Sequence, residues 1–202
     1  MRLYLSSYRL GDHPEHLRAL FKSERARVAV IANALDAVPA ELRAEMVERE
    51  LADLAGLGLT GVELDLRSSV DLQGYDGVWV RGGNVFVLRT AFARSGFDVL
   101  LKSALEADSI VYAGYSAGAC VLAPSLRGLE LCDPVSDVDG EVLWDGLGLI
   151  DEAIVPHVDS PGHPETDLVR PIVDLYRRTG VPHLTLRDGQ ALLVTGSSRQ
   201  VV

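Results

Sequence analysis

The sequence predicts an α/β fold of three layers, in which helices cover both faces of a mostly parallel β-sheet. The first observation is that strand-like segments are apolar almost without interruption, as in Ala-Arg-Val-Ala-Val-Ile-Ala at residues 26–32. The second is that segments with apolar residues at helical spacing, such as residues 39–57, lie between them. Strands that are buried on both faces and separated by helices are typical of parallel sheets. We expect the 202 residues to form one domain, residues 1–202.

The same alternation predicts the remaining elements in order. Strands are expected at residues 2–6, 26–32, 60–64, 77–80, 109–113, 153–155 and 183–186, followed by a terminal hairpin of residues 191–194 and 200–202. Helices are expected at residues 14–21, 39–57 and 164–178, and after Asn84. Residues 125–148 are rich in Asp, Glu and Gly and break the alternation. This segment is expected to form strand fragments and loops around a site.

Composition excludes several classes of function. The formal net charge is −10, so no basic stripe is available to meet nucleic-acid phosphates. No apolar run approaches the length of a membrane span. The apolar segment among the first residues is too short for a signal peptide. The protein is therefore expected in the cytoplasm. Cys120 and Cys132 match neither a disulfide framework nor a zinc pattern, and are interpreted as small buried side chains. No metal or cofactor is expected.

The segment Gly114-Tyr115-Ser116-Ala117-Gly118 lies between a predicted strand and a predicted helix. A Gly-x-Ser-x-Gly pentapeptide in that context is the pattern of a nucleophile elbow. Small flanking residues let the backbone turn sharply and lift the Ser116 hydroxyl above the sheet. The helix N-terminus behind it offers N–H groups to a developing oxyanion. A Gly/Ser-rich turn without chemistry is the alternative.

Two further segments could carry chemistry. Residues 80–86, Val-Arg-Gly-Gly-Asn-Val-Phe, place a glycine pair between a strand and a helix, where ligands gather in open α/β sheets. A plain turn with Asn84 as helix cap would look the same. His157 follows a short strand, and acidic residues lie between it and Ser116. This agrees with the Ser, acid, His order of many hydrolases.

Together, Gly-Gly-Asn-x-Phe, Gly-x-Ser-Ala-Gly-Ala and the Pro-His that follows Gly-Leu-Gly-Leu resemble the S51 serine peptidases. That family holds the aspartyl dipeptidases (peptidase E) and the cyanophycinases, and its fold resembles the class I glutamine amidotransferase domain. The resemblance runs from about Val78 to Ala191. It implies Ser116 as nucleophile, His157 as general base, and an oxyanion hole made by the N–H groups of Gly83 and Ala117.

The acid of the triad is open on sequence alone. The aspartate that follows the serine in the dipeptidases has its register at Leu131, with Glu130 and Asp133 on either side. We favour Glu130, because it keeps the chain order and segment of the family pattern. Asp159 stands two residues past His157, where amidotransferase-like relatives carry a glutamate. Asp188, in Leu-Arg-Asp-Gly-Gln, ranks last and is interpreted as a turn residue.

The resemblance also points to substrate-binding residues, with Asn84, Asp167 and Arg170 as the candidates. Aspartyl dipeptidases carry Glu-Thr-Arg after the histidine, and their arginine binds the substrate's aspartate side chain. The matching run here is Glu165-Thr166-Asp167, so an anion replaces a cation. We therefore expect Asp-Xaa dipeptides to be poor substrates, with neutral or basic side chains preferred.

The predicted function is a serine peptidase that hydrolyses short peptides as an exopeptidase or dipeptidase through an acyl-enzyme. The partner is the peptide substrate, and the sequence is compatible with a homodimer. Two alternatives remain: a small serine esterase, and a catalytically silent, amidotransferase-like sensor or interaction protein.

Overall fold

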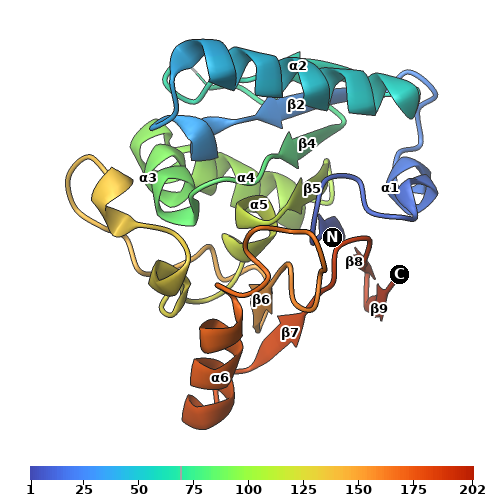
Figure 1. Cartoon of the computed structure of the whole chain (residues 1–202). Helices are drawn as coiled ribbons and strands as arrows, with labels where there is room; N and C mark the ends of the chain where they lie inside the picture. The colour runs from blue at the N-terminus through green and yellow to red at the C-terminus, as the bar shows by residue number, and fades with distance from the viewer. Residues whose placement is uncertain (69) are drawn as a thin grey trace.

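The computed structural model describes residues 1–68 and 70–202, and a seven-stranded sheet forms its centre (Figure 1). The strand order is β3-β2-β4-β5-β1-β8-β9; neighbours from β3 to β1 are parallel, and β8 and β9 add antiparallel strands. The expected mostly parallel α/β fold is confirmed. The strands of this sheet are β1 (Arg2–Ser6), β2 (Arg27–Ile31), β3 (Thr60–Glu63), β4 (Gly77–Val80), β5 (Val111–Tyr115), β8 (Ala191–Thr195) and β9 (Ser198–Val201).

Two further strands, β6 (Ala153–Val155) and β7 (His183–Thr185), pair in parallel as a separate small sheet. The helices are α1 (Pro14–Ala19), α2 (Ala40–Gly56), α3 (Val85–Ser95), α4 (Phe97–Glu106), α5 (Ala117–Cys120) and α6 (Arg170–Thr179). Short 3-10 turns are formed by Asn33–Leu35, Leu129–Leu131 and Val135–Asp137.

Alternating strand residues produce the three layers. In β2, Val28 and Val30 face the core that contains residues of α1 and α2. Ala29 and Ile31 face the opposite core, which contains residues of α3, α4 and α5. Successive strand side chains point to opposite faces, so an uninterrupted apolar strand supplies both cores. Figure 1 shows α2 on one side of the sheet and α3 to α5 on the other.

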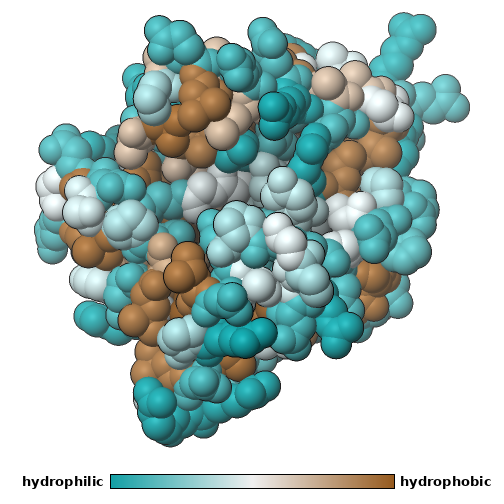
Figure 2. Space-filling model, viewed as in Figure 1, coloured by the Kyte–Doolittle hydropathy of each residue, from teal (hydrophilic) through white to brown (hydrophobic). Residues whose placement is uncertain are grey.

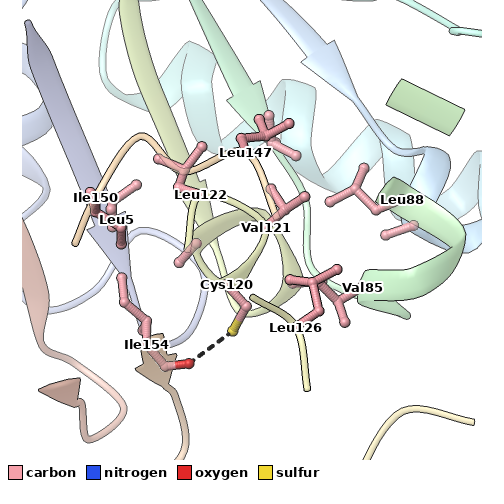
Figure 3. Packing of buried hydrophobic residues seen from close by; sticks show 14 of the residues in the cluster. Leu5, Val85, Leu88, Cys120, Val121, Leu122, Leu126, Leu147, Ile150 and Ile154 are labelled. Atoms are coloured by element: carbon pink, nitrogen blue, oxygen red, sulfur yellow. Dashed lines mark hydrogen bonds between the residues drawn. The ribbon is translucent and has the colours of Figure 1, made fainter. Parts of the chain in front are cut away.

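The larger core supports α5, the short helix that follows Ser116. Cys120 is buried there among leucine, isoleucine and valine side chains, and its Sγ donates to the carbonyl oxygen of Ile154 at 3.2 Å (Figure 3). Burial raises the pKa of the Cys120 thiol well above its ordinary value. The thiol therefore stays neutral and acts as a small buried side chain that ties α5 to β6, as expected.

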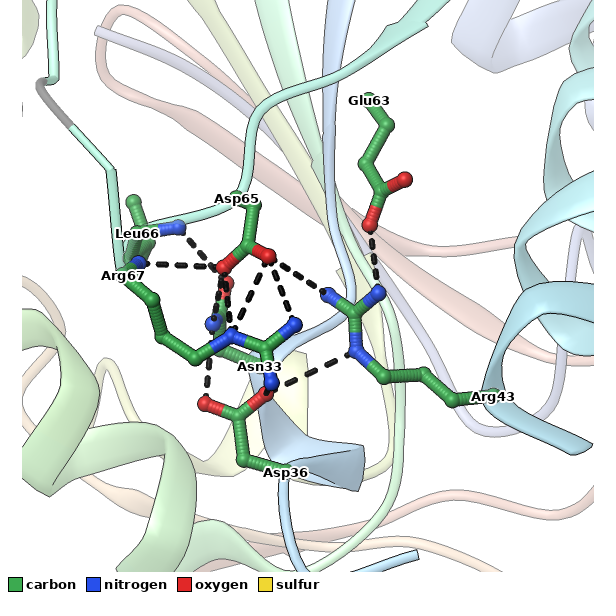
Figure 4. A network of polar contacts seen from close by, with 7 residues as sticks. All are labelled: Asn33, Asp36, Arg43, Glu63, Asp65, Leu66 and Arg67. Atoms are coloured by element: carbon green, nitrogen blue, oxygen red, sulfur yellow. Dashed lines mark hydrogen bonds and ion pairs between the residues drawn. The ribbon is translucent and has the colours of Figure 1, made fainter. Parts of the chain in front are cut away.

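A polar network fixes the turn at residues 33–35 against the segment after β3 (Figure 4). Asn33 accepts the N–H of Leu66 and donates to Asp36 and Asp65. Arg43 of α2 joins this group through Asp36 at 3.5 Å and Asp65 at 3.9 Å, and it also pairs with Glu63 at 2.6 Å. The neighbouring residue, Ala34, accepts the N–H of Asn84 at 3.1 Å. The network thus supports the loop at the start of α3.

One expected helix begins later than predicted. Residues 164–169 form turns, and α6 starts at Arg170 instead of Pro164. The Thr166 hydroxyl explains the difference, because it donates to the carbonyl oxygen of His157 and accepts the N–H of Ser160. A side chain that bonds a distant backbone in this way holds its own segment in a loop.

Within residues 1–68 and 70–202, no helix combines the length and apolar character that crossing a membrane requires. Figure 2 shows hydrophobic side chains gathered in separate patches, with hydrophilic surface between them.

A substitution at Gly118 tests how closely α5 packs on the sheet. A Cβ at this residue would overlap the carbonyl oxygen of Val80, so Gly118→Ala must displace α5 or β4. We expect Gly118→Ala to lower the free energy of unfolding by about 1–3 kcal/mol in urea titrations. Gly56→Ala is the matched control, since within residues 1–68 and 70–202 no atom beyond its chain neighbours and its own helix backbone would lie within 4 Å of the added Cβ. The control should be neutral or slightly stabilising, and equal stability of the two variants would contradict this packing.

Candidate active site

Ser116 occupies a sharp turn between β5 and α5, with φ 50° and ψ −118°. A non-glycine residue in this conformation is strained and persists only where its surroundings impose it. Gly82 is part of those surroundings, because a Cβ there would come within 2.8 Å of Ser116 Cβ. The Ser116 hydroxyl makes no hydrogen bond within the described part of the chain. The predicted elbow is therefore present, with its hydroxyl unengaged.

A cavity of about 180 Å³ opens beside this turn. Ser116, Gly83 and His157 all contribute to its walls, although they come from three separate loops. The cavity is lined by Tyr8, Arg9, Met46, Arg49, Glu50, Arg81, Gly82, Gly83, Tyr115, Ser116, His157, His163 and Glu165.

His157 is 1% exposed and adopts φ 61° just past β6. Its Nδ1 lies 2.7 Å from Asp188 Oδ1. A carboxylate at this distance accepts the Nδ1 proton, which leaves a lone pair on Nε2. Burial lowers the pKa of His157 below its ordinary value of 6.5, while the hydrogen bond to Asp188 opposes that shift. The imidazole is therefore neutral at pH 7 and can accept a proton.

Ser7, directly after β1, joins the backbone of His157 to its acid. The N–H of His157 donates to Ser7 Oγ at 2.8 Å, and Ser7 Oγ donates to Asp188 Oδ1 at 2.8 Å. The N–H of Asp188 donates to Ser160 Oγ, also at 2.8 Å. These bonds fix the carboxylate on the Nδ1 side of the ring.

The expected hydrogen bond between Glu130 and His157 is not formed. Glu130 lies in the turn of residues 129–131, where its carboxylate accepts the N–H of Gly128 at 2.5 Å. Asp133 accepts the N–H of Val85, and Asp159 is exposed. The carboxylate that lies beside His157 is instead that of Asp188, because the loop between β7 and β8 bonds to the backbone at the end of β1, where Ser7 donates its N–H to Gln190.

Gly83 lines the cavity beside Ser116, and Ala117 directly follows Ser116 and lines a second, small cavity with it. Within residues 1–68 and 70–202, neither of their N–H groups has an acceptor. Gly83 has φ 143°, and a Cβ there would come within 2.7 Å of the Ala34 carbonyl oxygen. Asn84 caps α3, accepting the N–H groups of Phe86 and Val87.

The three predicted substrate-binding residues lie outside the cavity lining. Asn84 is occupied by its capping bonds and by the carbonyl oxygen of Pro134. Asp167 and Arg170 face solvent, 80% and 63% exposed, and pair with each other at 3.6 Å. The late start of α6 explains this placement, because the segment that carries Asp167 is a turn held by Thr166.

Sequence reasoning missed Tyr8, His163 and Glu165. His163 stacks on His157 with ring centroids 3.7 Å apart and an interplanar angle of 3°. Tyr8 meets both rings edge-on. Ser7 and Tyr8 follow directly on the carboxyl end of a parallel strand, where ligands collect, and that position was the available signal.

Asp133 carries the most unusual carboxyl group near the site. It accepts the N–H of Val85 at 2.7 Å, at the N-terminus of α3. Burial raises the pKa of Asp133 from its ordinary value of 3.8 to about 7, and the hydrogen bond only partly opposes this. Deprotonation of Asp133 near pH 7 therefore changes the charge at the start of α3, next to Gly83.

Comparisons with known proteins agree on one family. The model of peptidase family S51 matches residues 5–202. A peptidase E of Streptomyces coelicolor is 32% identical over 157 residues, 74% of this chain and 61% of that protein. An uncharacterized peptidase of Listeria monocytogenes is 29% identical over 136 residues, 64% of this chain and 65% of that protein. The chain thus matches somewhat less than two thirds of these relatives' lengths.

A solved structure supports the fold. The crystal structure of a protein assigned as a peptidase E from Listeria monocytogenes EGD-e superposes with a TM-score of 0.84 at 24% identity. The superposition covers 100% of this chain and 97% of that chain.

Asp133→Asn tests the buried carboxyl. Because the pKa of Asp133 is raised on folding, the stability its protonated form contributes is present below about pH 4 and is lost as pH rises through about 7. Asparagine keeps an acceptor for Val85 but cannot ionise. The variant should therefore gain stability relative to wild type between pH 4 and pH 8, measured by chemical unfolding. Asp159→Asn, at an exposed side chain, is the control, and an identical pH dependence for Asp133→Asn and wild type would contradict the assignment.

Proposed function

This chain belongs to peptidase family S51, and on that premise we propose that it is a serine peptidase acting on short peptides. The observation that carries the proposal is one shared cavity. It is lined both by Ser116 in a strained elbow and by His157, whose Nδ1 is bonded to a carboxylate.

In the proposed reaction, Ser116 Oγ attacks the peptide carbonyl carbon while its proton passes to His157 Nε2. Collapse of the tetrahedral intermediate breaks the C–N bond, and His157 returns the proton to the leaving amine. Water then attacks the acyl-enzyme carbonyl as His157 Nε2 takes its proton. The acyl C–Oγ bond breaks to release the carboxylic acid product, and His157 returns the proton to Ser116 Oγ. Because Nε2 and the serine hydroxyl are not hydrogen-bonded to each other in this structure, substrate binding must bring them together.

Gly83 and Ala117 are the proposed oxyanion donors. Their unengaged N–H groups support the role, since donors that already have acceptors would lose those bonds on each turnover. Loss of one such donor costs about 10²–10³ in kcat in comparable sites. The turn of residues 33–35 and Asp133 hold Gly83's loop from either side.

Asp188 is the proposed acid of the triad. As an acceptor for Nδ1–H it selects the tautomer that presents the Nε2 lone pair, and it stabilises the imidazolium that forms when Ser116 loses its proton. Ser7 supports this role by orienting the same carboxylate oxygen.

A second, small cavity of about 20 Å³ lies against Ser116 and Ala117, and we propose that it receives the side chain of the residue whose carbonyl is attacked. It has room for about one water molecule or one methyl group. Its described lining includes two carboxyl groups but no Lys or Arg. The residues are Ser116, Ala117, Cys120, Leu129, Cys132, Asp133, Pro156, Glu165, Val169 and Ile172. In this proposal Asp133 and Glu165 are the carboxyl groups that disfavour an acidic substrate side chain, a role that the sequence had suggested for the exposed Asp167.

Asp188→Asn should separate the candidate acids. An asparagine amide that donates to Nδ1 would stabilise the wrong tautomer, so we expect kcat to fall by about 10²–10⁴-fold with a much smaller change in KM. Glu130→Gln is the matched control and should keep near wild-type kcat, because the Glu130 carboxylate accepts the N–H of Gly128 in its own turn. A large loss in Glu130→Gln with little in Asp188→Asn would restore Glu130 as the acid.

A dipeptide and tripeptide library, read by mass spectrometry, tests function and specificity together. Wild type should cleave peptides with Gly, Ala or Ser at the attacked residue fastest and Asp-Xaa peptides poorly, because the small cavity is narrow and carries carboxyl groups. Ser116→Ala should cleave none of them. Cleavage by Ser116→Ala would refute the nucleophile, and rapid Asp-Xaa cleavage by wild type would refute the pocket.

A further inference from the structure

His157, His163 and Glu165 form a cluster of metal-ligating side chains at the wall of the active-site cavity. Each offers one ligand atom, and these three atoms all lie within 4.8 Å of one another. Imidazole nitrogen and carboxylate oxygen are ligands that Zn²⁺ takes, and three protein ligands plus an open position are typical of accessible zinc sites. The cavity beside the cluster supplies that open position.

The two atoms that face each other between His157 and Glu165 would both be stabilised by a cation placed between them. His157 Nε2 and Glu165 Oε2 are 3.7 Å apart. The ring proton of His157 is on Nδ1, which donates it in the hydrogen bond to Asp188. The two facing atoms, Nε2 and Glu165 Oε2, are therefore both hydrogen-bond acceptors, so neither can hydrogen-bond the other. Ligand bonds of about 2.0–2.1 Å place two ligands of one tetrahedral zinc about 3.4 Å apart. A small rotation of the half-exposed Glu165 side chain would reach that spacing.

The surroundings of His157 suit ligation as well as catalysis. Metal-binding histidines usually donate their second ring N–H to a carboxylate, which orients the ring and raises its basicity. Asp188 accepts that bond here at 2.7 Å. His163 must adjust more, because its ring is stacked on His157 and its Nδ1 accepts the N–H of Glu165 at 3.2 Å. A ring whose Nδ1 accepts a hydrogen bond carries its proton on Nε2, so His163 would have to release the Glu165 N–H, move its proton to Nδ1 and tilt out of the stack to direct the Nε2 lone pair at the ion.

We propose that His157, His163 and Glu165 bind one Zn²⁺ ion, which reversibly inhibits the enzyme. The ion would occupy the Nε2 lone pair that must take the proton of Ser116. It is therefore an inhibitor and not a cofactor of the reaction. The inhibitory effect rests on the proposed role of His157 as general base, whereas the binding itself does not.

Binding is measured by titrating ZnCl₂ into Ser116→Ala protein in a calorimeter, so that catalysis is not needed for the readout. One ion per chain should bind. Glu165→Gln and His163→Asn, each added to Ser116→Ala, should weaken zinc affinity at least about tenfold. His16→Asn is the matched control, because His16 lies near His13 elsewhere on the surface, and it should leave the affinity unchanged. Circular dichroism checks that each variant is folded.

Absence of zinc binding would overturn the site, as would an affinity that survives both Glu165→Gln and His163→Asn or that falls with His16→Asn. In wild type, ZnCl₂ should inhibit peptide hydrolysis and a chelator should restore it. Zinc binding without inhibition would overturn the blocking role. A wild type that hydrolyses no peptide even without zinc would count against the peptidase proposal and leave the calorimetric result standing.

Discussion

The close packing of α5 on the end of β4 is the constraint on which the site depends. Gly118 has no room for a side chain against the Val80 carbonyl, so the helix starts directly over the sheet. That proximity forces Ser116 into its strained turn and brings Gly82 against its Cβ. Because β4 continues into Gly83, the one contact between α5 and the end of β4 positions both the proposed nucleophile and one proposed oxyanion donor. The strain at Ser116 is offset by the apolar core that buries α5 from below.

The second organising feature is a set of hydrogen bonds that joins three distant loops. Ser7 follows β1, His157 follows β6, and Asp188 lies between β7 and β8. Hydrogen bonds of 2.7–2.8 Å nevertheless join Ser7 Oγ to the His157 N–H and to Asp188 Oδ1, and Asp188 Oδ1 to His157 Nδ1. Burial disfavours the charged imidazole, while the carboxylate favours it. A base that is neutral at rest but stabilised once protonated is what acyl transfer needs. The same lone pair on Nε2 is what makes the cluster with His163 and Glu165 attractive to a cation.

Local patterns made much of this predictable. Apolar strands, helical periodicity and the Gly-x-Ser-x-Gly turn depend on neighbours in sequence, so the α/β fold and the elbow at Ser116 could be predicted. Asp188 could not, because its pairing with His157 spans 31 residues and depends on where a loop folds. In sequence, Leu-Arg-Asp-Gly-Gln looks like any turn. The family resemblance assigns Asp167 to the substrate pocket by its match to the arginine of Glu-Thr-Arg, but the Thr166 hydrogen bonds hold this segment in a turn and Asp167 faces solvent.

The central claim is that Ser116 is a nucleophile activated by His157. The most direct measurement is the intact mass of the protein after treatment with a fluorophosphonate, followed by peptide mapping. The account predicts one adduct per chain, on Ser116, that forms in wild type but not in a folded His157→Gln variant, because the hydroxyl needs the imidazole to take its proton. An unmodified wild type, or an adduct on a different serine, would contradict it.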